Sequence, residues 1–193
     1  QYFLIQLASG GANGIALPTP DWTNTITNMS ATAGKVALLN TTTALSGSGC
    51  PFDTSVVDFV GYGTTADCRE GTTTADNAPS PSNTTADLRN GNGSIDTDNN
   101  NLDFTEGSPA PRNTLSPTST VTPTVTETGT VTPTLTITLT STVTLTPTIT
   151  PTSTNTALSP AANIVISEFR TIGPNGGNDE FIELFNPSNF AVV

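Results

Sequence analysis

Glu180-Phe-Ile-Glu-Leu-Phe-Asn186 is a strand-like stretch near the end of the chain, and Asn163-Ile-Val-Ile-Ser-Glu-Phe-Arg170 is a second one just before it. Both are short runs rich in Ile, Val and Phe, which is typical of β-strands. The stretch between them, Gly173-Pro-Asn-Gly-Gly-Asn-Asp179, consists of turn-forming residues, and Pro187 ends the second run. The end of the chain therefore predicts two strands joined by a turn-rich loop.

The remaining sequence predicts more short strands and little helix. Candidate strands or extended pieces cover residues 1–8, 34–40, 56–60 and 101–105. Residues 12–33 and 64–95 have the composition of loops, and we expect Trp22 in the first of them to cover an edge of the core. No segment has a sustained apolar period of 3.6 residues. Short strands separated by Gly, Pro and Asn turns favour an all-β fold, a sandwich or a barrel.

Two groups of motifs resemble the lamin-tail domain family. Ile164-Val-Ile-Ser-Glu-Phe169 and Glu180-Phe-Ile-Glu-Leu-Phe-Asn-Pro187 are similar to the opening of such a domain. Its closing part is matched by Gly34–Asn40, Val56–Gly63, Asp96–Phe104 and Pro109-Ala-Pro-Arg-Asn113. The resemblance implies an immunoglobulin-like β-sandwich. It also implies a secreted or surface-attached accessory module, as bacterial members of the family typically are.

The family's closing strands come first in this chain and its opening strands come last. We therefore predict the end of one domain at 1–113, a linker at 114–161 and the N-terminal strands of a second domain at 162–193. The strands that the family places between these two parts are missing, so the sandwich is expected to be incomplete at both chain ends. One explanation is a piece cut from a tandem array. The other is strand exchange, in which residues 162–193 complete the sandwich of a neighbouring chain.

The expected linker contains a Thr/Pro-rich tract. Threonine occupies every even position from Thr118 to Thr156, and Val, Leu, Ile, Pro or Ser occupies most odd positions. Dense Thr with interspersed Pro predicts an extended, O-glycosylated stalk. An ordered β-like fibre is the alternative, because a period of two would place all the threonines on one face of a strand. The candidate O-glycan sites are Thr122, Thr124, Thr132, Thr134, Thr146, Thr148 and Thr150.

Composition argues against several function classes. The chain has 5 basic and 16 acidic residues, a formal charge of −11, so nucleic acid is not an expected partner. No apolar run approaches the roughly 20 residues that a membrane span requires. Histidine is absent, which excludes histidine-based acid–base catalysis and a Ser-His-Asp triad. The acidic residues are scattered over predicted loops, so we expect no enzyme activity.

Two local features suggest a disulfide and a metal site. Cys50 and Cys68 are expected to pair in an oxidising compartment, which would close a loop worth about 3 kcal/mol. Asp96, Asp98, Asn100 and Asp103 have the spacing of oxygen ligands in a calcium loop. Asn101 replaces the turn glycine of an EF-hand and Gly107 replaces its bidentate glutamate. The alternative is a cluster of Asx turns without calcium.

These features together predict a non-enzymatic extracellular or cell-surface protein, in which β-sandwich modules are spaced by the tract. The expected partners are other copies of the chain or cell-surface proteins and glycans. The rival hypothesis is an accessory binding module of a larger secreted hydrolase, of nuclease or phosphoesterase type, whose catalytic domain lies elsewhere. Further sandwich–tract repeats in the flanking reading frame would favour the first hypothesis, and a catalytic domain would favour the second.

Overall fold

A computed structural model describes residues 1–7, 16–46, 50, 52–117, 164–173 and 179–188. The described part is built mainly from strands, as the sequence predicts, and its helices are single turns. The larger sheet is mixed and six-stranded, in the order β2-β1-β8-β7-β5-β6, and the smaller one pairs β3 with β4. The strands are β1 (Tyr2–Gln6), β2 (Trp22–Thr23), β3 (Gly34–Leu39), β4 (Val56–Tyr62), β5 (Ala86–Arg89), β6 (Phe104–Gly107), β7 (Val165–Arg170) and β8 (Phe181–Phe185). The helical turns are η1 (Thr74–Asp76), α1 (Asn90–Gly93) and α2 (Asn100–Asp103).

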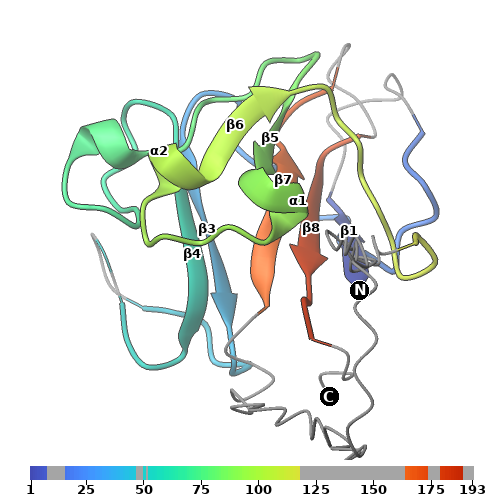
Figure 1. The fold of residues 1–193 in the computed structure, drawn as a ribbon, viewed down its shortest axis with the longest axis horizontal. Helices are drawn as coiled ribbons and strands as arrows, with labels where there is room; N and C mark the ends of the chain where they lie inside the picture. Colours follow the sequence, from blue (N-terminus) through green and yellow to red (C-terminus); the bar gives the residue numbers. More distant parts are fainter. Residues whose placement is uncertain (8–15, 47–49, 51, 118–163, 174–178, 189–193) are drawn as a thin grey trace, which may run out of the picture. The chain divides into compact units, whose positions relative to one another are not determined.

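The two strands from the end of the chain lie in the middle of the larger sheet (Figure 1). β8 is antiparallel to β1 over five residue pairs, from Tyr2–Phe185 to Gln6–Phe181. β7 is antiparallel to β8 on one side and to β5 on the other. Residues 1–118 and 158–193 accordingly form one compact unit. The sequence assigns 162–193 to a second domain, whereas here its strands belong to the same unit as 1–113. A tandem array and a strand-exchanged fibre would use these same strand pairs, so the choice between them stays a prediction.

The core lies between the two sheets, on what we term the inner face of the larger sheet. Val60 and Tyr62 of β4 meet Ile166 and Phe169 of β7 there, together with Phe104 of β6. The rings of Tyr62 and Phe104 lie 5.2 and 5.6 Å from that of Phe169. Burying large aromatic side chains of this kind contributes most of the energy that holds two sheets together.

The opposite, outer face of the larger sheet carries a smaller apolar cluster of Leu4, Ala86 and Phe181, with Leu17 and Leu88 against it. A chain segment without regular structure, residues 108–116, follows β6 and crosses this face. It is the yellow stretch that runs from β6 down the right-hand side of β8 in Figure 1. We call it the closing segment, because it contains the Pro109–Asn113 motif.

Three elements differ from the sequence-based expectations. β5 lies in a region that the sequence predicts as loop. Two of its four residues, Asp87 and Arg89, are charged, so no apolar pattern marks the strand. Both nevertheless face the core, at 0% and 2% exposure. Residues 100–103 form the turn α2 instead of an extended piece, since the Asn99 side chain accepts the Leu102 N–H as an N-cap. Trp22 does not cover the core, because 52% of its surface is exposed.

The predictions for the Thr/Pro tract fall outside the described residues. Those are the stalk or fibre conformation of Thr118–Thr156 and the O-glycan sites at Thr122, Thr124, Thr132, Thr134, Thr146, Thr148 and Thr150.

Candidate functional site

Two buried glutamates hold the closing segment on the outer face. Glu168 of β7 accepts the Ala110 N–H through Oε1 at 2.8 Å. Glu183 of β8 accepts the Arg112 N–H at 2.5 Å and the Arg112 Nη2 group at 2.8 Å. Both glutamates have 0% exposure. The opening and closing motifs of the sequence are therefore bonded to each other directly.

A bulge in β7 brings a third polar group to Glu183. The register of β7 against β8 shifts between Ile166 and Glu168, which leaves Ser167 as an extra residue. Its hydroxyl donates to Glu183 Oε1 at 2.6 Å. The turn α1 lies directly over the bulge, where a Cβ at Gly93 would come within 2.6 Å of the Ser167 Cβ. Gly93 also has a φ of +89°, so both space and backbone conformation require glycine.

The closing segment is also fixed to β1. The Arg112 guanidinium stacks 3.8 Å from the centre of the Tyr2 ring and donates to its hydroxyl at 2.7 Å. Farther along, Asp21 accepts the Thr114 N–H at 3.1 Å and the Leu4 N–H at 2.8 Å. The closing segment thus bonds to three neighbouring strands, β7 and β8 directly and β1 through Arg112 and Asp21.

The two carboxylate oxygens of Glu168 differ in their surroundings. Its Oε2 is buried and has no partner among the described residues. Burial raises the pKa of this carboxyl to about 7, although the hydrogen bond from the Ala110 N–H favours the charged form and lowers the pKa. Cavities of about 450 and 440 Å³ both border the closing segment at Ala110, and Glu168 lines the second. Because this oxygen is shielded from solvent, the arrangement suits a structural fastening better than acid–base catalysis.

A second polar centre lies on the inner face around Arg89. Its Nη2 group donates to both carboxylate oxygens of Asp58 at 2.8 Å, and both side chains are fully buried. Asp58 also accepts the Ile166 N–H at 2.6 Å. The guanidinium lies 4.6 Å from the centre of the Phe104 ring. This ion pair links β4 of the smaller sheet to β5 and β7 of the larger one.

The structure gives the predicted calcium ligands different partners. Asp103 accepts the Thr97 N–H and hydroxyl, at 3.0 and 2.7 Å, and Asp96 pairs with Arg89 at 3.2 Å. Asp98 is exposed, with a φ of +55°. Within the described residues, the carboxylates of Asp96, Asp98 and Asp103 do not form a metal-sized group. Asp103 thus satisfies the backbone N–H of an earlier loop residue, and the Asp98 N–H lies 3.4 Å from Asp96 Oδ1, as in an Asx turn. Whether this loop binds calcium stays a prediction.

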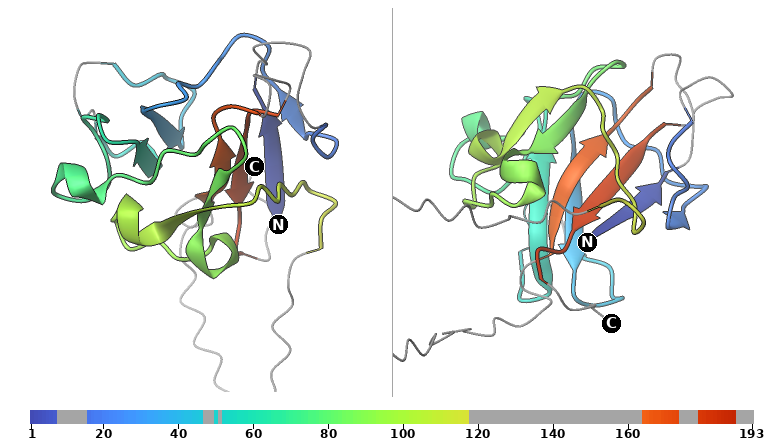
Figure 2. Two further views of the ribbon diagram at one scale, coloured as in Figure 1. Left: turned by 90° about the horizontal axis from the view of Figure 1, so that it is seen from above. Right: turned by 45° about the vertical axis from the view of Figure 1, so that its right-hand side comes forward.

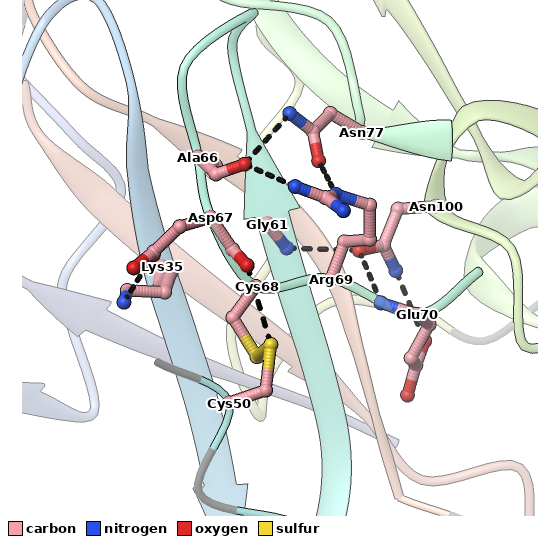
Figure 3. Close-up of a disulfide and its surroundings, with 10 residues drawn as sticks. All are labelled: Lys35, Cys50, Gly61, Ala66, Asp67, Cys68, Arg69, Glu70, Asn77 and Asn100. Atoms are coloured by element: carbon pink, nitrogen blue, oxygen red, sulfur yellow. Dashed lines mark hydrogen bonds and ion pairs between the residues drawn. A yellow bond between two sulfur atoms is a disulfide. The ribbon is translucent and has the colours of Figure 1, made fainter. Parts of the chain in front are cut away.

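Asn100, the fourth predicted ligand, is a buried hub (Figure 3). Its Oδ1 accepts the N–H groups of Gly61 and Glu70 at 2.8 and 3.1 Å. Its Nδ2 donates to the Phe59 carbonyl at 2.9 Å and to Glu70 Oε2 at 3.0 Å. All four hydrogen-bonding positions of the amide are occupied, so the side chain ties α2 to β4 and to the stretch after Cys68.

One oxygen each of Asp58, Glu70 and Asp96 lie within 4.8 Å of one another. Burial and then the neighbouring Asp58 and Asp96 carboxylates raise the pKa of Glu70 to about 8. The Arg89 guanidinium already bonds to Asp58 and Asp96. Arg89 therefore supplies the positive charge that a metal ion would otherwise bring to these carboxylates.

Cys50 and Cys68 form a disulfide, with their Cα atoms 4.9 Å apart (Figure 3). Cys68 is fully buried beside β4, and a Cβ at Gly61 would lie 2.0 Å from its carbonyl oxygen. Arg69 donates to the Asn77 side chain and to the Ala66 carbonyl, which fixes the stretch around the bridge. The disulfide thus anchors an irregular segment to the smaller sheet.

The sequence analysis missed the glutamate fastening and the Asp58–Arg89 pair. A signal was present, since Glu183 lies within the otherwise apolar β8 and Glu168 lies beside the apolar Phe169 in β7. A charged residue at such a position needs a buried partner. The partners, however, lie 71 residues from Glu183 and 58 from Glu168 in the chain.

Comparisons with protein-family models, with curated proteins and with solved structures found no match to this chain. Among the described residues, the helical turns are too short to span a membrane.

Asn100→Asp tests whether this residue is a structural hub. The new carboxylate would face the Phe59 carbonyl and Glu70, where an amide N–H₂ now donates, so two buried acceptors lose their donor. Each lost buried bond costs about 1–3 kcal/mol. We expect a clear fall in the melting temperature, with or without calcium. A calcium ligand would behave in the opposite way, with Asp at this position giving a larger stabilisation by added calcium.

The buried carboxyls predict greater stability in mild acid. Burial, and then Glu106, raise the pKa of Asp87 to about 8, and burial raises the pKa of Glu180 to about 7. Both carboxylate oxygens of Asp87 are buried without a partner in the described structure. Folding therefore favours the protonated forms, and the stability they contribute is lost as the pH rises from about 4 towards 8.

We expect the melting temperature to fall by roughly 5 °C or more between pH 5 and pH 8.5. Asp87→Asn should flatten part of this slope, because the amide does not ionise. Asp53→Asn is the matched control, since the exposed Asp53 has a lowered pKa that matters only in stronger acid. A melting temperature that rises over this pH range in the parent protein would contradict the assignment.

Proposed function

We propose that this chain is a non-enzymatic structural and interaction protein of the cell surface or extracellular space. Its ordered unit is an immunoglobulin-like β-sandwich of the lamin-tail type, and the Thr/Pro-rich tract spaces such units. Copies of the chain are linked by exchange of the β7–β8 strand pair, which assembles them into a fibre.

The observation that carries this proposal is the position of β7 and β8. They separate β1 from β5 in the larger sheet, so the residues before the tract cannot complete this sheet alone. Without them, β1 and β5 would each present an unpaired edge, which is a template for another strand. A β7–β8 pair from a neighbouring chain would form the same ladders and the same bonds to Ala110 and Arg112.

Two further observations support the extracellular and non-enzymatic parts of the proposal. The Cys50–Cys68 disulfide is typical of an oxidising compartment. The buried carboxylates of Glu183 and Asp58 are bonded to backbone N–H groups and arginines of the protein itself. They contribute to closing the fold and are not directed at a substrate.

Cross-chain disulfide trapping tests strand exchange. Phe3 and Leu184 are directly opposed in the β1–β8 ladder, so cysteines at these positions can be linked. Chains with Phe3→Cys and chains with Leu184→Cys are mixed, refolded together and oxidised. We expect a disulfide-linked dimer that contains one chain of each kind, because β8 of one chain pairs with β1 of the other.

Two controls define the result. A chain with both substitutions reports the pairing within one molecule, and a mixture of Leu184→Cys with Thr41→Cys, at an exposed loop, reports accidental contacts. If the double variant closes fully within one chain while the mixture forms no more dimer than the loop control, strand exchange is rejected.

A further inference from the structure

The smaller sheet covers only part of the inner face of the larger one. Register places Phe3 opposite Leu184 and Ile5 opposite Ile182, and β2 places Trp22 beside Ile5. Directly paired residues point to the same face of a sheet. Five apolar side chains therefore share the inner face beyond β7, and we call them the apolar shelf: Phe3, Ile5, Trp22, Ile182 and Leu184.

Exposure rises steadily across this face. Ile166 and Phe169 of β7, beneath the smaller sheet, have 0% exposure. On β8 the shelf residues are half-buried, on β1 Phe3 is 39% exposed, and on β2 Trp22 is 52% exposed. In the left view of Figure 2, β1 lies on the far side of the unit from β3 and β4. The second layer of the fold thus ends above β8, and the shelf continues beyond it.

The strand next to the shelf can accept another strand. In the described part of the chain, β3 has one strand neighbour, β4. Val36 and Leu38 of β3 point to the core and are only partly buried, as are Ile182 and Leu184. A strand added to β3 would extend the smaller sheet over β8 and β1 and would cover the shelf.

The chemistry of the occupant follows from these surfaces. The shelf has no charged member, and the one charged side chain of β3, Lys35, pairs with Asp67 at 2.6 Å. The occupant must therefore be uncharged, free of proline along its bonded length, and apolar at every second position. It must also be at least as long as β3, which has six residues.

One segment of this sequence meets all of these requirements. Between Pro133 and Pro147 the sequence reads Thr134-Leu-Thr-Ile-Thr-Leu-Thr-Ser-Thr-Val-Thr-Leu-Thr146. It has no charge, and five of its six odd positions are Leu, Ile or Val. It lies outside the described residues, so the argument uses its sequence alone.

We propose that the apolar shelf, together with the edge of β3, binds an extended strand formed by residues 134–146 of a second copy of this chain. The threonines at the even positions would face solvent, and the apolar residues at the odd positions would cover the shelf. This interface differs from the β7–β8 exchange and does not depend on it, because it leaves the β1–β8 and β5–β7 ladders unchanged.

A complementation experiment with full-length chains tests the proposal. The shelf variant carries Phe3→Lys and Trp22→Lys, two exposed positions. The segment variant carries Ile137→Ser and Leu139→Ser, and its matched control carries Thr136→Ser and Thr138→Ser in the same segment. Molar mass is measured by light scattering over a range of concentrations, and circular dichroism and melting temperature verify that each variant is folded.

We expect the parent and the Thr136→Ser, Thr138→Ser control to associate as concentration rises. The shelf variant and the segment variant alone should each have a lower average molar mass than the parent at equal concentration, because only β7–β8 exchange can still link their copies. An equimolar mixture of the two should have a higher average molar mass than either variant alone. In that mixture, the intact shelf of the segment variant can bind the intact segment of the shelf variant. A mixture whose average molar mass is no higher than that of either variant alone overturns the proposal, as does a segment variant that associates like the parent, since the shelf would then bind something else. Neither result affects the cross-chain trapping of β1 with β8.

Discussion

The bonds from Glu168 and Glu183 to the closing segment are the interactions on which the rest of the structure depends. A buried carboxylate is costly unless donors satisfy it, so these two side chains fix the path of whatever supplies those donors. Here the donors are mainly the backbone N–H groups of Ala110 and Arg112, with Ser167 and the Arg112 guanidinium completing the shell of Glu183. If the closing segment left the outer face, Glu168 would lose the Ala110 donor and Glu183 would keep only the Ser167 hydroxyl, both in an apolar surrounding.

This constraint joins parts of the chain that lie far apart in sequence. β7 and β8 supply the glutamates and also fill the space between β1 and β5. On the inner face, the buried Asp58–Arg89 pair performs the matching task, because it ties the smaller sheet to β5 and β7. Both faces of the larger sheet are thus locked by charged groups, and the apolar residues around them provide the burial energy. Removing the β7–β8 pair would remove the outer lock and also the hydrogen bonds that Asp58 and Arg89 make to Ile166 of β7.

The sequence predicted the strands well where apolar residues dominate. The strands at 2–6, 34–39, 56–62, 165–170 and 181–185 lie within or close to the predicted ranges. β5 was missed because Asp87 and Arg89 occupy its inward positions, and no periodicity rule assigns charged residues to a core. Asn100 was assigned to a calcium loop from its spacing, whereas its bonds to Gly61 and Glu70 depend on a fold that spacing does not encode. The position of β7 and β8 between β1 and β5 also depends on long-range pairing, which one sequence does not reveal.

Hydrogen exchange at the Ala110 and Arg112 amides tests the central claim most directly, because these two N–H groups are the donors to Glu168 and Glu183. If the glutamates fasten the closing segment, both amides will exchange as slowly as those of β7, and Glu183→Gln will selectively speed exchange at Arg112. Exchange at both amides as fast as in the exposed loop at residues 41–44, while β7 stays protected, would contradict the account.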